Sequence, residues 1–328
     1  MTETSGALHS ALVTARDLIF IENTNGGTVS IIDSTRLEVV GEIEVGHHPD
    51  DVIASPDGEI IYVNRQETRD VVAVDTGSHS IMWSVDLDGL PHHLGITPDG
   101  GRLYVALFDS SVDAVIDTDS HTVVAQPATG WGTHGVFRSP GGERFYVGSM
   151  FLDMISVVDV AAWSTARAIP MREGVRPFAI TSDERRLYAQ LSRVHGFDVV
   201  DLETDEVIRS VELPPLPPEI RLPRFFPHTV NHGLKITPDD RTLLAAASIA
   251  GYVAFYALPE CELMGTVSVG AEPNWIVLSS DTSLAFVSNR AEDTVSVIDI
   301  DARAEVARIK VGSYPQRMTV VPRSRPPR

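Results

Sequence analysis

The sequence predicts an all-β protein, a seven-bladed β-propeller with four antiparallel strands in each blade. The first observation is an internal repeat of 42 residues, in which "GHHPDDVIASPDGEIIYVN" from Gly46 aligns without a gap with "DGLPHHLGITPDGGRLYVA" from Asp88. The second concerns the two ends of the chain. "GSYPQRMTVVP" matches only the start of a unit and "DLIFIENTNGGTVSIID" only its remainder, so together they complete a seventh unit and close the ring.

Each unit contains four short segments with alternating apolar residues and many β-branched or aromatic side chains, which favours strands. Turns such as Pro56-Asp57-Gly58 separate them. The predicted propeller domain covers residues 15–322, between an N-terminal leader at 1–14 and a C-terminal tail at 323–328. Its blades are predicted at about 46–87, 88–129, 130–171, 172–213, 228–269, 270–311, and 312–322 joined to 15–45, with an insertion at 214–227.

Several of these segments resemble a known family of repeats. The stretches "IYVNR", "LYVAL" and "FYVGS", the "SPDG" and "TPDG" turns and the "VSVID" strand are similar to YVTN-repeat β-propellers over nearly the whole chain. Related seven-bladed propellers include lactonases, streptogramin B lyase and the haem d1 domain of nitrite reductase. The resemblance therefore implies the fold, while activity has to be argued from the site.

The composition restricts the partners and the compartment. The formal net charge is -19, from 45 acidic and 26 basic residues, which argues against nucleic acid and anionic membranes as partners. The single cysteine, Cys261, permits no intrachain disulfide and no cysteine-based metal cluster. No signal-peptide or membrane-spanning pattern is present, so we expect a cytoplasmic protein. A closed ring has no free sheet edge, which favours a monomer.

One column of the repeat is polar in every unit, yet its identity changes from unit to unit. It lies six residues before the turn proline and precedes the apolar positions of the first strand. Its members are Asp50, His92, His134, Arg176, His232, Asn274 and Gln316. Because the first strand of each propeller blade is innermost, these side chains are expected to form a ring at one mouth of the central channel.

Three histidines in this ring allow two kinds of chemistry. His92, His134 and His232 could bind one divalent ion (Zn, Fe, Mn or Cu) with an open position for substrate. Asp50 would then assist, and Arg176 would hold an anionic group of the substrate. Without a metal, a histidine would act as general acid or base and Arg176 would stabilise an enolate or oxyanion. Simple solvation of polar side chains at a wet channel mouth is the third interpretation.

Further residues at the same rim are candidates for substrate binding. They are Arg317, Asn274, Gln316, His228, Arg224, Phe225, His195 and Trp275. Arg224 and Phe225 belong to the proline-rich insertion, which could act as a lid. Adjacent residues of an extended strand point in opposite directions, so His93 is not expected to join His92 at one ligand.

These observations favour a cytoplasmic enzyme that acts on a small anionic molecule at the channel mouth, with lyase, isomerase, cyclase or hydrolase chemistry. The alternative is a non-catalytic YVTN propeller that binds a protein or peptide through its rim loops. The sequence has no haem-attachment motif and no nucleotide-binding loop, so we expect neither cofactor.

Overall fold

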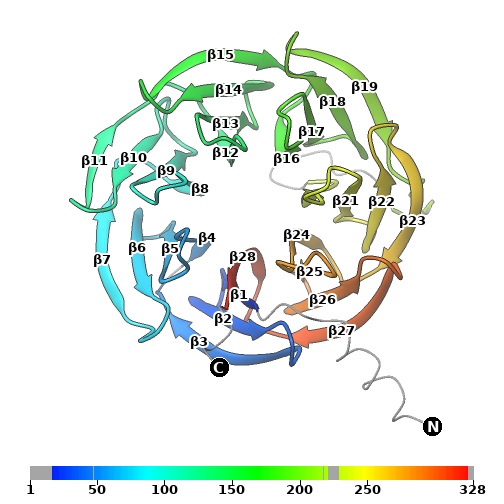
Figure 1. Cartoon of the computed structure of the whole chain (residues 1–328), viewed down its shortest axis with the longest axis horizontal. Helices are drawn as coiled ribbons and strands as arrows, with labels where there is room; N and C mark the ends of the chain where they lie inside the picture. The colour runs from blue at the N-terminus through cyan, green and yellow to red at the C-terminus, as the bar shows by residue number, and fades with distance from the viewer. Residues whose placement is uncertain (1–16, 47, 217, 221–228, 324–328) are drawn as a thin grey trace.

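The computed structural model describes residues 17–46, 48–216, 218–220 and 229–323. In these residues 28 strands form seven four-stranded antiparallel sheets, arranged as blades around a central axis (Figure 1). No helix that could cross a membrane is found in this part of the chain. The predicted seven-bladed propeller is therefore confirmed.

The blades are numbered here in chain order from the first complete one. Blade 1 contains β4 (Pro49–Ala54), β5 (Ile60–Arg65), β6 (Asp70–Asp75) and β7 (Ile81–Asp86). Blade 2 contains β8 (Pro91–Ile96), β9 (Arg102–Leu107), β10 (Ala114–Asp117) and β11 (Thr122–Ala125). Blade 3 contains β12 (Thr133–Arg138), β13 (Arg144–Ser149), β14 (Met154–Asp159) and β15 (Ser164–Pro170).

The remaining blades follow the same order from the channel outward. Blade 4 contains β16 (Val175–Ile180), β17 (Arg186–Leu191), β18 (Gly196–Asp201) and β19 (Glu206–Glu212). Blade 5 contains β20 (Leu234–Ile236), β21 (Thr242–Ala247), β22 (Tyr252–Ala257) and β23 (Glu262–Ser268). Blade 6 contains β24 (Pro273–Leu278), β25 (Leu284–Asn289), β26 (Thr294–Asp299) and β27 (Ala304–Lys310). Blade 7 contains β28 (Pro315–Pro322), β1 (Asp17–Asn23), β2 (Thr28–Asp33) and β3 (Glu38–Glu44).

Blade 7 joins the two ends of the chain, as predicted. The C-terminal strand β28 pairs antiparallel with β1, with Phe20 opposite Thr319 and Asp17 opposite Pro322. Strands β1, β2 and β3 then follow toward the outside of the ring. The ring is thus closed by backbone hydrogen bonds between segments about 300 residues apart in sequence.

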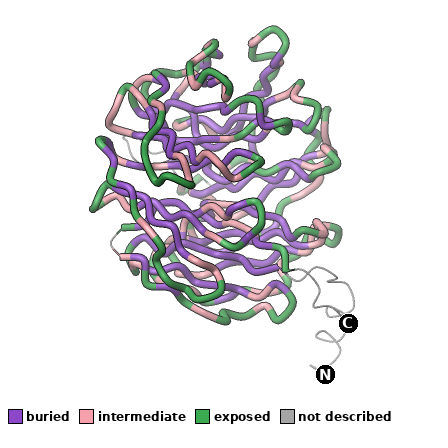
Figure 2. The backbone as a smooth tube through the Cα atoms, turned by 60° about the vertical axis from the view of Figure 1, so that its left-hand side comes forward, coloured by how far each residue is buried: buried purple, intermediate pink, exposed green. Residues whose placement is uncertain are grey.

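Burial follows the position of a strand in its blade. All residues of β1 are buried, whereas most residues of the outer strand β3 are exposed. Figure 2 shows buried backbone running through the interior of the molecule and exposed backbone in many of the loops at its edge. Tyr104 and Phe286, which occupy the same position of the repeat in blades 2 and 6, are fully buried. The core therefore lies between neighbouring blades, and it holds the inner strands firmly around the channel.

Part of the predicted organisation cannot be placed. The predicted leader at 1–14, residues 221–227 of the predicted insertion and the end of the predicted tail lie outside the described residues. The first half of the predicted insertion is described at residues 214–216 and 218–220, and these residues form no strand.

Candidate functional site

A β-bulge places the polar column at the channel. In six blades the innermost strand has one more residue than its partner at this point. In blade 2, for example, the inner strand advances three residues from Pro91 to Leu94 while its partner advances two, from Leu107 to Val105. A bulge releases a residue from the ladder and redirects its side chain. In blade 5, β20 begins only at Leu234, so His232 precedes the ladder.

A cavity of about 230 Å³ lies where these bulges meet. Six residues predicted from the sequence line it: His92, His134, Arg176, His232, Gln316 and Arg317. Six others that were not predicted as site residues also line it: Gln66, Leu90, Phe108, Met150, Thr229 and Arg290, the last from a loop expected at this rim. Polar and cationic groups from several blades therefore face one small space with an apolar side.

The three imidazole rings lie side by side in this cavity. The ring centroids of His92 and His134 are 4.5 Å apart, and those of His134 and His232 are 5.2 Å apart. The Nδ1 atom of His232 lies 3.0 Å from the carbonyl oxygen of Asn274, so Nδ1 carries the proton and donates it. Its Nε2 atom then carries a lone pair, which faces Nε2 of His134 at 3.4 Å. With His232 in this tautomer, Nε2 of His134 carries a proton and donates it to Nε2 of His232.

The tautomer of His92 is set by Arg317. The guanidinium Nη2 of Arg317 lies 3.0 Å from Nδ1 of His92, and a guanidinium can only donate. Nδ1 of His92 therefore accepts, and its proton resides on Nε2. The Oδ2 atom of Asp50 also lies 3.1 Å from this Nδ1, but the contact is no ion pair while His92 is neutral.

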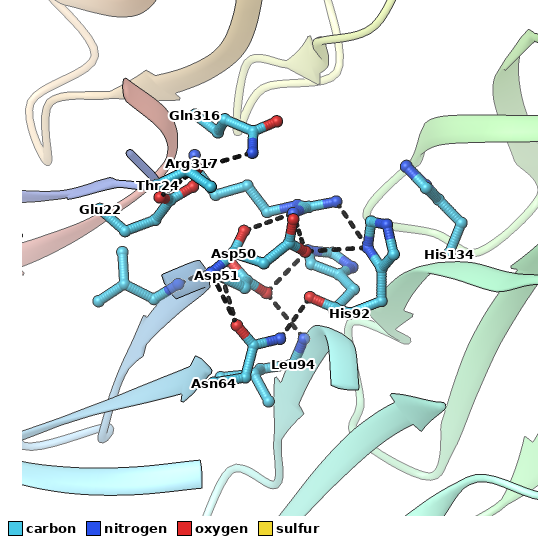
Figure 3. Close-up of polar contacts among 12 residues, drawn as sticks. Glu22, Thr24, Asp50, Asp51, Asn64, His92, Leu94, His134, Gln316 and Arg317 are labelled. Atoms are coloured by element: carbon cyan, nitrogen blue, oxygen red, sulfur yellow. Dashed lines mark hydrogen bonds and ion pairs between the residues drawn. The ribbon is translucent and has the colours of Figure 1, made fainter. Parts of the chain in front are cut away.

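Arg317 is the centre of a buried charged network (Figure 3). Its side chain is 2% exposed and contacts both the Oδ2 atom of Asp50, at 2.6 Å, and the backbone oxygen of Asp50. Its backbone amide donates to Oε1 of Glu22 at 2.9 Å. Its guanidinium carbon also lies 5.6 Å from the ring centre of Trp275, a cation–π contact. Arg317 thus binds blade 7 to blade 1 and orients His92 of blade 2.

Burial and positive charge keep the imidazoles neutral. Burial, then the positive charges of Arg317 and Arg176, hold the pKa of His92 well below its ordinary value. Burial first, and then His92 and Arg317, do the same to the pKa of His134. The pKa of His232 is likewise well below its ordinary value, because of burial and then Arg317, Arg290 and Arg176. All three rings are therefore neutral at pH 7.

Three guanidinium groups give the cavity a positive potential. Burial lowers the pKa of Arg176 to about 9, and repulsion from Arg290 and Arg317 adds to this effect. The group still keeps its proton at neutral pH. Carboxylates offset part of this charge, because Asp50 pairs with Arg317 at 2.6 Å and Glu272 lies 3.5 Å from Arg290. Burial, however, raises the pKa of Asp50 and that of Glu22. The cavity is therefore suited to a small anion.

The other predicted site residues that the structure describes do not line this cavity. Asp50 acts behind it, through Arg317. Asn274 is buried and holds His232 by its backbone oxygen. His195 lies within 3.1 Å of Asn231 and Tyr252 and contacts the backbone of Pro214, so it joins blades 4 and 5. Trp275 lines a different cavity. His228, Arg224 and Phe225 lie outside the described residues.

His92 and His93 face different spaces, in agreement with the predicted alternation. His92 lines the 230 Å³ cavity, whereas His93 lines a second one of about 370 Å³ further along the inner strands. Nδ1 of His93 accepts the backbone N–H of Val136, and its Nε2 lies 3.4 Å from Oδ2 of Asp51. His93 therefore joins blades 1, 2 and 3 and does not contribute to the histidine cavity.

The predicted three-histidine metal site is not supported by the geometry. Two imidazole nitrogens bound to one tetrahedral zinc ion at about 2.0–2.1 Å lie about 3.4 Å apart, so the separation of His134 and His232 alone would suit an ion. A catalytic ion needs a third protein ligand. The described residues contain no group of three or more His, Cys, Asp or Glu side chains that could hold a metal ion. The three surrounding guanidinium groups also oppose a cation.

The ring of blades and its cavity define a seven-bladed propeller with a cationic, histidine-containing pocket at one channel mouth. Solved structures share this fold at low sequence identity. Hydrazine synthase from Kuenenia stuttgartiensis matches with a TM-score of 0.73 and 19% identity, over 85% of this chain and 91% of that one. The dihydro-haem d1 dehydrogenase NirN, solved in complex with DHE, matches with a TM-score of 0.66 and 16% identity, over 89% of this chain and 63% of that one.

A third structure has the highest TM-score of these three. It is a functionally unknown protein from Desulfotomaculum acetoxidans, with a TM-score of 0.76 and 11% identity, covering 93% of this chain and 98% of that one. No protein-family model and no curated protein matches the chain. At these identities the comparisons support the fold alone. The resemblance to YVTN repeats is thus supported for the fold and not for the family.

Proposed function

We propose that the protein is an enzyme that binds a small anion at the channel mouth and transfers a proton to or from it. Arg176 and Arg290 hold the anionic group, and the His134–His232 pair supplies the acid–base groups. The reaction class that fits is a lyase, isomerase or cyclase reaction that begins by removing a proton next to a carboxylate or carbonyl group. We also propose that the protein belongs to the YVTN-repeat family and that it is a monomer in the cytoplasm.

One observation carries the proposal: neutral imidazoles and several cations face the same small cavity. A general base must be unprotonated and close to its proton donor. The Nε2 lone pair of His232 faces Nε2 of His134 at 3.4 Å, so a proton can pass between the two rings. The neighbouring guanidinium groups would stabilise the negative charge that develops on an enolate.

Binding of an anion would also raise the pKa of His232, the proposed base. Positive charges from Arg317, Arg290 and Arg176 lower the pKa of His232, after burial as the main cause. An anion among these groups offsets part of their field, which raises the pKa of the imidazole toward neutrality. The substrate would thus convert a weakly basic imidazole into one that accepts a proton at neutral pH.

The cavity volume limits the substrate. Sites for drug-sized ligands have volumes of about 300–1,000 Å³, and this cavity has about 230 Å³. Leu90, Phe108 and Met150 provide an apolar side. A carboxylate of a few carbon atoms fits both the volume and the charge.

The experiment is hydrogen–deuterium exchange of substrate carbons. The protein is incubated in D2O with a panel of two- to six-carbon carboxylates, including 2-oxo and 3-oxo acids, and loss of C–H signals is followed by NMR. We expect exchange with at least one compound, and a loss of about 10²–10⁴-fold in His232→Gln, the range for a general base. Arg176→Gln should weaken binding more than it lowers the maximal rate.

Arg193 provides a matched control because its side chain is 65% exposed and pairs with Glu173. Arg193→Gln should exchange like the wild type. A chelator or added Zn²⁺ should leave the rate unchanged, whereas a metal requirement would favour the metal-assisted interpretation of the histidines. Exchange that survives both His134→Gln and His232→Gln would contradict the proposed acid–base pair.

A second candidate function has one observation in its favour. Trp131 and Phe151 are 54% and 50% exposed, and Phe151 packs against Phe108 with ring centroids 5.1 Å apart. Exposed aromatic side chains beside a pocket are typical of protein or peptide contacts. If the panel gives neither exchange nor binding, a non-catalytic rim that binds a peptide becomes the better interpretation.

A further inference from the structure

The channel contains a second chamber beyond the histidine cavity. It has a volume of about 370 Å³ and is lined by later residues of the same inner strands, among them Leu94, Val136, Val277 and Met318. Trp275 lies between the two spaces. Its ring is 6.1 Å from that of His232 on one side, and 5.2 Å from that of His93 on the other. Phe137, stacked with Trp275 at 6.2 Å, extends this aromatic layer.

A lysine projects into this chamber, although the chain has only two lysines, Lys235 and Lys310, beside 24 arginines. Lys235 is the middle residue of β20. Its neighbours Leu234 and Ile236 are buried, whereas Lys235 is exposed to the interior of the channel and lines the chamber. Desolvation lowers the pKa of the Lys235 amine. Arg138 lines the same chamber, and desolvation lowers its pKa too.

The charge of these two groups is not offset by the chamber wall. Within the described residues, neither Lys235 nor Arg138 has a hydrogen-bond or ion-pair partner. Asp51 is the one carboxylate among the lining residues of this part of the chain. Its Oδ1 accepts from the amide of Val52 and its Oδ2 from that of Leu94, at 2.8 and 2.7 Å. Burial raises the pKa of Asp51 to about 7, so its charge is incomplete at neutral pH.

We propose that this chamber is a second ligand site, for a small monocarboxylate with an aromatic or branched aliphatic body. The carboxylate pairs with the Lys235 ammonium group, and Arg138 adds positive potential. The body of the ligand packs on Trp275, Phe137 and the aliphatic wall. A volume of 370 Å³ lies within the usual range for small-molecule sites of about 300–1,000 Å³. Two cations without a carboxylate partner among the described residues give this space a positive potential that attracts an anion.

The low lysine content gives a direct test. The whole protein is treated with a limiting amount of acetic anhydride, with and without phenylacetate, and acetylation of each lysine is measured by mass spectrometry. Bound phenylacetate should protect Lys235 about tenfold at a concentration near ten times its dissociation constant. Lys310 is the internal control, because its side chain is 68% exposed and pairs with Asp293 at the surface. Its acetylation should not change.

Three comparisons make the test specific. Inorganic phosphate should protect Lys235 much less than phenylacetate, because it lacks an apolar body. Lys235→Met should abolish phenylacetate binding measured by calorimetry, whereas Lys310→Met should retain it. His134→Gln should still show protection of Lys235, which separates this site from the acid–base pair. Equal protection of both lysines, no protection at the solubility limit of phenylacetate, or equal protection by phosphate would each overturn the proposal.

Discussion

His134 is the residue whose protonation state has the clearest consequence for stability. Burial, then His92 and Arg317, hold its pKa well below the ordinary value of about 6.5. The folded chain therefore binds fewer protons than the unfolded chain below that pH. The stability that neutral His134 contributes is complete above pH 6.5 and is lost as the pH falls toward the folded-state pKa, by at most about 1.4 kcal/mol per pH unit.

His134→Gln removes this dependence on pH. We expect the difference in the free energy of unfolding between wild type and variant to shrink by about 1 kcal/mol from pH 6.5 to 5.5. Urea denaturation at pH 8, 6.5 and 5.5 measures it, and pH 8 is the control because the ring is neutral in both states there. An unchanged difference at all three pH values would show that His134 is not held neutral by the fold.

Single residues at the cavity were predictable to different degrees. The repeat identified His92, His134, His232 and Arg176, because they occupy a column that is polar in every unit but changes in residue identity. A position that only maintains the fold is expected to keep the same type of residue in every unit. It did not reveal that Arg317 is nearly fully buried, because a charged residue in the repeat is normally solvated. Arg290 and Phe108 come from loops after second strands. Those loops contain many polar or aromatic residues, and their distance from the axis is not encoded in any spacing.

At the scale of the strand, the bulges determine where the site residues point. In blade 1, the bulge is held by Asn64 at the end of β5. Its Oδ1 accepts from the backbone amides of Asp50 and Asp51, at 3.2 and 2.6 Å, and its Nδ2 donates to the carbonyl of His92 at 2.6 Å. Asn64 therefore fixes the inner strands of two adjacent blades at the cavity.

Asn64→Ala should lower the free energy of unfolding by about 1–3 kcal/mol, the cost of leaving buried backbone groups without partners. Ala106 occupies the same repeat position in blade 2, so alanine itself is compatible with the strand. Urea denaturation measures the loss, and Asn25→Ala, at an exposed turn, should change stability by less than about 0.5 kcal/mol. Equal stability of the two variants would contradict the role assigned to Asn64.

The strands themselves were predictable, and the bulges were not. Alternation and turn residues identify strands such as "IIYVN" from the letters alone. A bulge adds one residue without changing composition, so the histidine pair at 92 and 93 reads as ordinary alternation. Its two faces were predicted correctly, but the contacts of His93 with Val136 and Asp51 depend on the neighbouring blades.

At the scale of the whole molecule, the repeat explains why the fold could be predicted. Each unit buries its apolar faces only against its neighbours, so seven similar units imply a ring. The split seventh unit further indicated that the two ends meet, and the pairing of Phe20 with Thr319 confirms it. The metal assignment is not confirmed, because a shared column places side chains on one ring without fixing where their nitrogen atoms lie. Arg317, which follows Gln316 of the polar column, donates to His92 and adds positive charge to the site.

The closure of blade 7 should depend on the pairing of β28 with β1 and not on where the chain begins. A circular permutant that starts at Ser120, in the exposed turn between β10 and β11, joins the native ends through residues 323–328 and 1–16. Its blade 2 becomes the split blade, and every strand keeps its neighbours. We expect a melting temperature within about 4 °C of the wild type, which corresponds to roughly 1–2 kcal/mol for a domain of this size.

A truncation after Tyr314 is the contrasting variant. It removes β28, leaves β1 as an unpaired inner edge and deprives Asp50 of its partner Arg317. Loss of one partner of a buried ion pair alone costs about 3–5 kcal/mol, so we expect no cooperative thermal transition by circular dichroism. A truncated chain that melts like the wild type would show that blade 7 does not hold the ring closed. The permutation interrupts no strand sequence. If the permutant nevertheless fails to fold, closure of the ring must occur at the native ends.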